Sequence, residues 1–207
     1  MTLSKNIIFD LGGVILTIDY KRTIEAFRNL GISNAEDLYS KAAQSSLFDT
    51  LEKGLLSENN FFTAIRLLSD KPISNNQIKE AWNAILIGLP EENILVLEKL
   101  KNNHRLFLLS NTNSIHETAY KEMIVKQYGS FIFDGLFEKM YLSHHIHMRK
   151  PEPEIFEYVL SDSNIDINET CFIDDSPQHV EGARGVGIRS YLLKNESIGE
   201  FVNSLIC

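Results

Sequence analysis

The stretch IIFDLGGVIL, residues 7–16, combines the pattern of a buried strand with a single carboxylate. β-Branched and aromatic residues lead up to Asp10, as in a strand that is covered on both faces of a sheet. Gly12 and Gly13 then follow, where the absence of a Cβ lets the backbone approach a ligand closely. An unpaired carboxylate at the end of a buried strand is costly. Such a carboxylate therefore predicts partner groups elsewhere in the chain.

The composition limits the partners of the protein. The chain has 207 residues, 43% of them hydrophobic, and a formal net charge of −8. An acidic chain without a Lys/Arg run is a poor candidate for binding nucleic acid or an anionic membrane. If the protein binds a small phosphorylated metabolite, the positive charge that the phosphate needs must come from a single lysine or from a metal ion. We expect a monomer or a weak dimer.

The sequence also indicates a compartment. Met1 to Lys5 is too short and too polar for a signal peptide, and no apolar run approaches the length that spans a membrane. Cys171 and Cys207 are far apart and lack the spacing of metal ligands. We expect two free thiols in a reducing compartment, and hence a cytoplasmic protein.

Strand-like and helix-like segments alternate along most of the chain. Apolar runs predict strands at Asn6–Phe9, Leu106–Leu109, Met140–Leu142, Thr170–Ile173 and Ser190–Leu193. Helical spacing of apolar residues predicts helices at Glu91–Asn102, His116–Tyr128, Pro153–Leu160 and Gln178–Val186. This alternation predicts an α/β fold with a parallel, doubly wound, Rossmann-like sheet.

Between about Thr17 and Gly88 the pattern changes. This part has no convincing strand signal, and apolar residues recur at helical spacing in residues 21–31, 57–70 and 74–88. We interpret residues 17–89 as an inserted helical cap, and residues 1–16 and 90–207 as the Rossmann-like core. Phe61, Phe62 and Trp82 are expected to pack inside the cap.

Polar side chains follow three of the predicted strands. In a parallel sheet the carboxyl ends of the strands meet at one edge, where ligands bind. Asp10, the pair Ser110–Asn111 and the pair Asp174–Asp175 all lie at such ends, and Lys150 lies in a loop before a helix. Carboxylates brought together take up protons unless a cation neutralises them. Mg²⁺ suits the case, because it is held by one or two carboxylates and keeps positions for water and phosphate oxygens.

This set of residues predicts phosphoryl transfer. A carboxylate beside the ion can attack phosphorus and form an aspartyl-phosphate, and a lysine and a hydroxyl would hold the other phosphoryl oxygens. Each segment alone also fits a structural role: a turn at Asp10, a helix cap at residues 110–112, a helix start at residues 174–177, and a solvated turn at Lys150. The order and position of all four segments favour the functional interpretation. The histidines of residues 144–147 are interpreted as a polar loop leading to Lys150.

In their order along the chain, FDLGGV, SNT, MRKPEP and DD resemble the four motifs of the haloacid dehalogenase-like hydrolase superfamily. The resemblance spans residues 6–187. The amino-acid sequence of the motifs is similar to that of a bacterial branch that includes α-glucose-1-phosphate phosphatases. It implies a cap directly after the first motif.

The resemblance also implies roles for single residues. Asp10 would be the nucleophile and a Mg²⁺ ligand, and Lys150 would pair with Asp10 and with the phosphate. Ser110 and Asn111 would bind the phosphoryl group. The remaining Mg²⁺ ligands would be the backbone carbonyl of Gly12, the carboxylate of Asp175, and Asp174 either directly or through water.

One element of the family pattern is missing. Phosphatases of this superfamily usually carry a second aspartate two residues after the nucleophile, where it protonates the leaving group and then activates water. Here that position is Gly12. Three alternatives stay open: a substitute acid such as Asp19, His116, His179 or a cap residue; a substrate with a good leaving group, such as a sugar 1-phosphate; or a catalytically impaired relative that binds a phosphorylated ligand or a protein partner. Dehalogenation ranks low, because it needs no metal to offset the paired aspartates.

Overall fold

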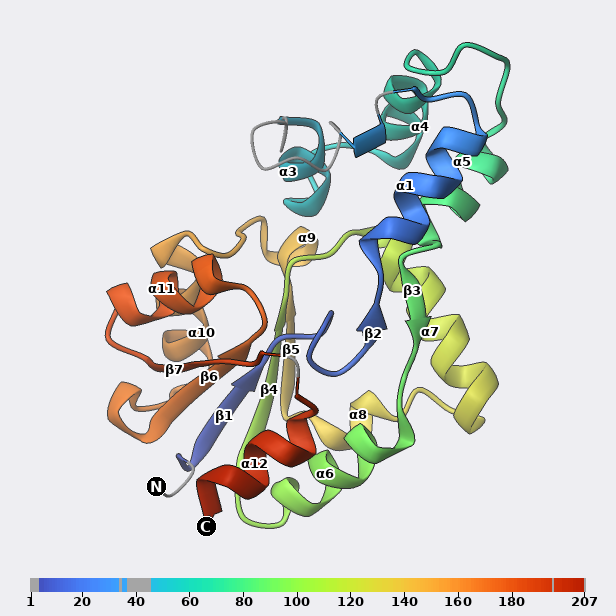
Figure 1. Ribbon diagram of the computed structural model, residues 1–207. Helices are drawn as coiled ribbons and strands as arrows, with labels where there is room; N and C mark the ends of the chain where they lie inside the picture. The colour runs from blue at the N-terminus through green and yellow to red at the C-terminus, as the bar shows by residue number, and fades with distance from the viewer. Residues whose placement is uncertain (1–3, 34, 37–45, 195, 207) are drawn as a thin grey trace.

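A five-stranded parallel sheet forms the centre of the fold (Figure 1). The computed structural model describes residues 4–33, 35–36, 46–194 and 196–206, so the predicted thiol Cys207 lies outside the described residues. The order in the sheet is β5-β4-β1-β6-β7. Its members are β1 (Asn6–Phe9), β4 (Arg105–Ser110), β5 (Lys139–Leu142), β6 (Thr170–Asp174) and β7 (Arg189–Leu192). All five predicted strands and the Rossmann-like class are confirmed.

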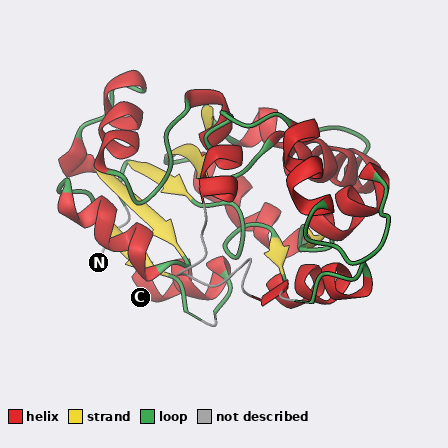
Figure 2. Cartoon of the chain, turned by 90° about the horizontal axis from the view of Figure 1, so that it is seen from above, coloured by secondary structure: helices red, strands yellow, loops and turns green. Residues whose placement is uncertain are grey.

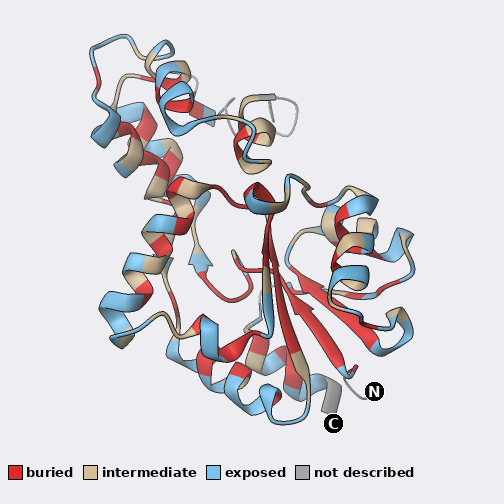
Figure 3. Ribbon diagram, turned by 180° about the vertical axis from the view of Figure 1, so that it is seen from behind, coloured by how far each residue is buried: buried red, intermediate tan, exposed pale blue. Residues whose placement is uncertain are grey.

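Both faces of the sheet are covered, which explains why its central strands β1 and β4 are apolar along most of their length. Ile7 and Phe9 of β1 face one hydrophobic core cluster, and Ile8 faces another. Figure 3 shows the central strands as buried along their length. The free thiol of Cys171 is also buried, in β6.

The helices of the core follow the strands in alternation. They are α6 (Glu91–Lys101), α7 (Ser114–Tyr128), α8 (Phe133–Leu136), α9 (Ser143–Ile146), α10 (Pro153–Asp162), α11 (Pro177–Gly185) and α12 (Ile198–Ile206), with a 3₁₀ turn at Ile167–Glu169. The four helices predicted here are confirmed. α7 begins before the predicted start at His116, because the side chain of Asn113 accepts a hydrogen bond from the backbone N–H of His116 and caps the helix. No described helix combines the length and the apolar character that crossing a bilayer requires.

A helical module lies beyond the carboxyl edge of the sheet (Figure 1). It comprises α1 (Tyr20–Asn29), α3 (Ser46–Glu52), α4 (Glu58–Arg66) and α5 (Asn75–Asn83). Seen from above in Figure 2, helices gather at one end of the molecule and the sheet lies toward the other. As predicted, Phe61, Phe62 and Trp82 are buried in the core of the module, a cluster that Ile115 of α7 also joins.

Two short strands connect the module to the core, and here the sequence-based expectation of no strand between Thr17 and Gly88 is wrong. β2 (Thr17–Ile18) pairs with β3 (Leu86–Gly88) in an antiparallel ribbon. The chain leaves the core through β2 and returns through β3 (Figure 1). Segments of two and three residues are too short to show an alternating pattern, so they escaped detection.

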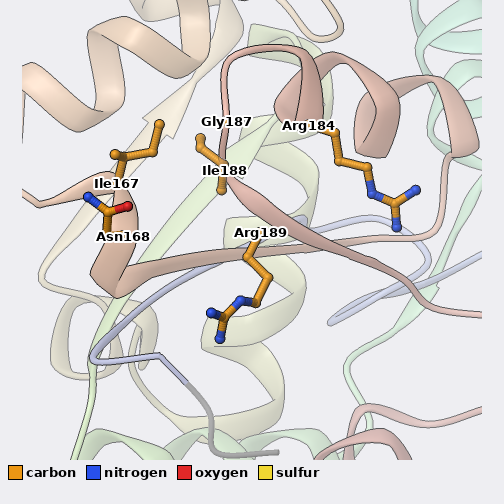
Figure 4. A pocket seen from close by; sticks show the side chains of 6 residues that line it. All are labelled: Ile167, Asn168, Arg184, Gly187, Ile188 and Arg189. Atoms are coloured by element: carbon orange, nitrogen blue, oxygen red, sulfur yellow. The ribbon is translucent and has the colours of Figure 1, made fainter.

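A surface hollow of about 220 Å³ lies at the opposite edge of the sheet (Figure 4). It is lined by residues near the amino ends of β6 and β7, such as Asn168 and Arg189, and by Arg184 in the last turn of α11. It is therefore separate from the strand ends that carry the predicted site.

Candidate active site

Lys150 brings two carboxylates together at the carboxyl edge of the sheet. Its Nζ donates hydrogen bonds to Oδ1 of Asp10 at 2.6 Å, to Oδ2 of Asp174 at 2.7 Å and to the carbonyl of Leu109 at 2.9 Å. The Lys150 side chain is fully buried, as is that of Asp174. The parallel strands thus gather residues from three distant segments around one ammonium group.

Asp175 completes a cluster of three carboxylates. Single carboxylate oxygens of Asp10, Asp174 and Asp175 all lie within 4.8 Å of one another. Asp174 is held from its other side, because Oδ1 accepts a hydrogen bond from the backbone N–H of Ser176 at 2.7 Å and lies 3.1 Å from Nδ1 of His179. Three convergent carboxylates form a donor set that suits a hard cation such as Mg²⁺.

Gly13 allows this cluster to form. Its φ of +81° is in the left-handed region, and a Cβ added there would lie 2.1 Å from Oδ2 of Asp175. A side chain at position 13 would therefore displace that carboxylate. Of the two glycines, Gly13 is therefore the one whose backbone closely approaches a carboxylate, that of Asp175.

The electrostatics of the cluster favour a bound cation. Burial, reinforced by the charge of Asp174, raises the pKa of Asp10 to about 7 against the attraction of Lys150. Asp175 is more exposed, but partial burial and then the charge of Asp174 raise its pKa to about 6. Burial opposes ionisation of Asp174 too, but Lys150 and His179 outweigh it and lower the pKa to about 2. A divalent ion would offset the repulsion that the raised values express.

The predicted phosphoryl-binding residues lie beside the lysine. Asn111 clasps the backbone of Lys150: its Oδ1 accepts from the Lys150 N–H and its Nδ2 donates to the Lys150 carbonyl, both at 2.9 Å. The structure thus gives this side chain a positioning role in addition to the predicted contact. Ser110 is buried at the end of β4, and its hydroxyl makes a long contact of 3.5 Å with the Asn111 carbonyl.

Ile18 occupies the space beside the position of the missing acid. A Cβ added at Gly12 would lie 3.1 Å from Cδ1 of Ile18, in the ribbon that leads to the helical module. A side chain at position 12 would therefore require the end of this apolar side chain to shift.

The three candidate substitutes named from the sequence have other contacts. Asp19 caps α1, accepting a hydrogen bond from the backbone N–H of Lys21. His116 stacks on Trp82, and burial lowers its pKa to about 3, so it is neutral at pH 7 and carries no proton to donate as an imidazolium. His179 faces Asp174. Among these three, only His179 contacts the carboxylate cluster.

Several residues near the site were missed from the sequence. Arg149, Glu52 and Asp49 form an ion-paired group where α3 meets the loop that precedes Lys150. Tyr20, about half exposed at the start of α1, lies near the carboxylates, since partial burial and then the charges of Asp175 and Asp10 raise the pKa of its phenol. The acidic residues of α3 are an i, i+3 pair on one helix face, but nothing in the sequence says which surface that face meets.

The histidines that precede the loop of Lys150 take part in a polar network. Nε2 of His144 and of His145 lie 2.9 Å and 3.0 Å from Oε2 of Glu117, and Lys121 pairs with the other oxygen of Glu117 at 2.7 Å. The network ties α7 to α9. His147 instead contacts the backbone carbonyl of Lys53, 2.7 Å from its Nδ1.

Comparisons with known proteins agree with this geometry. A sequence model of the family described as haloacid dehalogenase-like hydrolase matches residues 7–193. A D-ribitol-5-phosphate phosphatase of Bacteroides thetaiotaomicron is 30% identical over 191 residues, which cover 92% of each chain.

Solved structures give the same relationship. A haloacid dehalogenase family enzyme of Bacteroides thetaiotaomicron, in complex with magnesium and inorganic phosphate, is 37% identical with a TM-score of 0.83, over 96% of this chain and 98% of that one. A predicted hydrolase of this type from Porphyromonas gingivalis is 29% identical with a TM-score of 0.87, over 99% and 98% of the two chains. The sequence match over nearly the whole length and the shared fold establish that the chain belongs to the haloacid dehalogenase-like hydrolase family.

Proposed function

We propose that the protein is a Mg²⁺-dependent phosphatase that hydrolyses a small phosphate monoester through an aspartyl-phosphate on Asp10. The observation that carries the proposal is the convergence of Asp10, Lys150, Asp174 and Asp175 at one sheet edge. The relative crystallised with magnesium and inorganic phosphate supports the same chemistry.

The residues present fit a Mg²⁺ ion. Asp10 and Asp175, with Asp174 directly or through water and the backbone carbonyl of Gly12, would hold it. When bound, the ion would neutralise the carboxylates and polarise the phosphoryl oxygens. The raised pKa of Asp10 supports this assignment, because without a cation this carboxyl would be partly protonated at neutral pH.

The reaction would proceed in two displacements. An oxygen of Asp10 attacks phosphorus, the bond from phosphorus to the ester oxygen breaks, and the departing alkoxide takes a proton from solvent water to leave as the alcohol. Water then attacks the phosphorus of the aspartyl-phosphate, which releases inorganic phosphate and regenerates Asp10. Lys150 holds Asp10 in place and, with Ser110, stabilises charge on the transferring group.

The leaving group of the substrate would be a neutral sugar or sugar alcohol. At the rim of the site the described cations Arg149 and Lys53 are already paired with Glu52, Asp49 and Glu152. A second anionic group on the substrate would compete with these carboxylates. The relative named D-ribitol-5-phosphate phosphatase supports a polyhydroxylated substrate, and a sugar 1-phosphate would suit a site that has glycine at position 12.

The helical module, residues 17–89, would act as a cap over the phosphate. Its ribbon β2–β3 joins the core beside Gly12, and α3 lies against the loop that carries Lys150. Closure of such a cap excludes water from the site and sets specificity.

The test is a panel of phosphate esters assayed with Mg²⁺ and with EDTA. Ribitol 5-phosphate, a sugar 1-phosphate, a phosphorylated sugar acid and an aryl phosphate cover the leaving groups at issue. We expect Mg²⁺-dependent release of phosphate that is lost in Asp10→Asn, and preference for the neutral hydroxylated esters. The matched control is Asp134→Asn, an exposed aspartate in α8. Hydrolysis that survives in Asp10→Asn would refute the mechanism, and preference for the sugar acid would refute the substrate class.

A second candidate function rests on Gly12 and Ile18. With an apolar side chain against position 12, the protein could bind a phosphorylated ligand without turning it over. Calorimetry with Mg²⁺ and the same esters separates the two candidates. Heat of binding without any release of phosphate would favour a protein that binds the ligand but does not hydrolyse it.

A further inference from the structure

Arg149 joins the helical module to the loop that carries the catalytic lysine. Its Nε and Nη2 lie 3.0 Å and 2.8 Å from Oε2 of Glu52, and its Nη1 lies 3.1 Å from Oδ1 of Asp49. The Arg149 side chain is only 13% exposed. A guanidinium shared by two carboxylates of one helix face is a geometrically specific contact that a lysine could not reproduce.

Further contacts surround this pair on the same surface. We use the name lysine loop for residues 147–152. Nζ of Lys53 lies 2.6 Å from Oε1 of Glu152, and the carbonyl of Lys53 lies 2.7 Å from Nδ1 of His147. A Cβ added at Gly54 would lie 2.2 Å from the carbonyl of His144, so the two backbones touch. Lys53, which directly follows α3, therefore contacts both the first and the last residue of the lysine loop.

The same loop is held from the other side by the catalytic core. The next residue, Lys150, has its backbone clasped by Asn111 through two hydrogen bonds of 2.9 Å, and its Nζ reaches Asp10 and Asp174. Arg149 faces α3 and its neighbour Lys150 faces the carboxylates. A shift of Arg149 with α3 would therefore move the backbone from which Lys150 extends.

The charges at this contact are partly buried. Burial raises the pKa of Glu52 even though Arg149 opposes the effect. Removing one partner from a buried pair leaves the other charge without compensation, which is a strong perturbation. The partly buried pair between Arg149 and Glu52 should therefore stabilise the α3 contact more than an exposed ion pair would, since exposed pairs contribute little.

We propose that Arg149 is a positioning residue that couples docking of α3 on the lysine loop to the alignment of Lys150. The proposal rests on the phosphatase function proposed above. When α3 is docked, Arg149 sets the lysine loop and Lys150 points at Asp10. When α3 moves away, the loop loses that support and the phosphoryl-transfer step slows.

The first test compares variants of the full-length protein with Mg²⁺ and ribitol 5-phosphate, and with the aryl phosphate in parallel. We expect Arg149→Ala to lower kcat by roughly 10²-fold for both esters, the loss that misplacement of a reacting group by about 1 Å produces, while KM changes much less. Arg149→Lys should recover part of the loss, and Glu52→Gln should lower kcat in the same direction. The matched control is Arg189→Ala, at the exposed end of β7 away from the site.

Two kinetic outcomes would overturn the proposal. An unchanged kcat in Arg149→Ala would show that Lys150 does not depend on this contact. A raised KM with kcat intact would make Arg149 a substrate-binding residue instead.

Hydrogen exchange provides a readout that does not need turnover. We expect Arg149→Ala to increase amide exchange in residues 46–54 and in the lysine loop together, and Arg189→Ala to leave both unchanged. Faster exchange confined to residues 46–54 would show that the two segments are not coupled, and would refute the proposal. If the wild type shows no Mg²⁺-dependent activity, the proposed function fails, and this measurement still decides whether the coupling exists.

Discussion

Replacing Lys150 by methionine tests the electrostatic account of the site. Lys150 is fully buried between Asp10 and Asp174, and these two partners outweigh burial and raise its pKa. Methionine nearly preserves the volume but removes the charge, which leaves two buried carboxylates without a counter-charge. Breaking a buried pair in this way costs about 3–5 kcal/mol. At 2–4 °C per kcal/mol for a chain of this size, Tm should fall by roughly 6–20 °C.

The loss should depend on pH, and its sign follows from linkage. Without Lys150 the folded-state pKa of Asp10, already raised to about 7, should rise further, and that of Asp174 should rise from about 2 to above the ordinary value of 3.8. Between that value and the raised one, the folded state binds more protons than the unfolded state, so stability falls as pH rises. The variant should therefore lose most stability at pH 8 and less at pH 5, where the buried carboxylates accept protons.

Urea unfolding in EDTA at pH 5 and pH 8 measures this difference. Lys126→Met, at an exposed position in the last turn of α7, is the matched control and should change stability little at either pH. A loss for Lys150→Met that is equal at both pH values would mean that packing, and not charge, explains the destabilisation. A loss below about 1 kcal/mol, the net value of one ordinary hydrogen bond, would refute the reasoning outright.

Three further changes test separate parts of the site. Gly13→Ala should abolish Mg²⁺-dependent activity by displacing a carboxylate. Gly129→Ala controls for backbone strain of about 1–2 kcal/mol, because φ is +80° there and, among the described residues, none beyond its chain neighbours lies within 4 Å of the added Cβ. Equal activity in the two variants would contradict the assignment. Gly12→Asp combined with Ile18→Ala should raise kcat for an alkyl phosphate by roughly 10²-fold or more, since a positioned acid contributes that much; no gain in a folded variant would show that position 12 is not where the acid is lacking. His116→Gln should leave the pH profile of kcat unaltered, because the pKa of this imidazole is about 3, and a shifted acidic limb would show that it does transfer a proton.

The fold was largely readable from the sequence, because it depends on local patterns. Strands covered on both faces are continuously apolar, and residues 7–9 of β1 and 106–109 of β4 show this clearly. The ribbon β2–β3 was missed, since two or three residues carry no periodicity. The helical character of the module was correct, but the surface that α3 meets was not predictable.

Asp10, Lys150 and the pair Asp174–Asp175 could be predicted from the chain as neighbours at one edge of the sheet, because strand order and right-handed crossovers place them there. What surrounds them is a property of the folded molecule. That Gly13 makes room for Asp175, and that Ile18 lies against Gly12, depends on side-chain packing between segments far apart in the chain. Local periodicity carries no information about such contacts, because it reports which face of an element is buried and not what covers it.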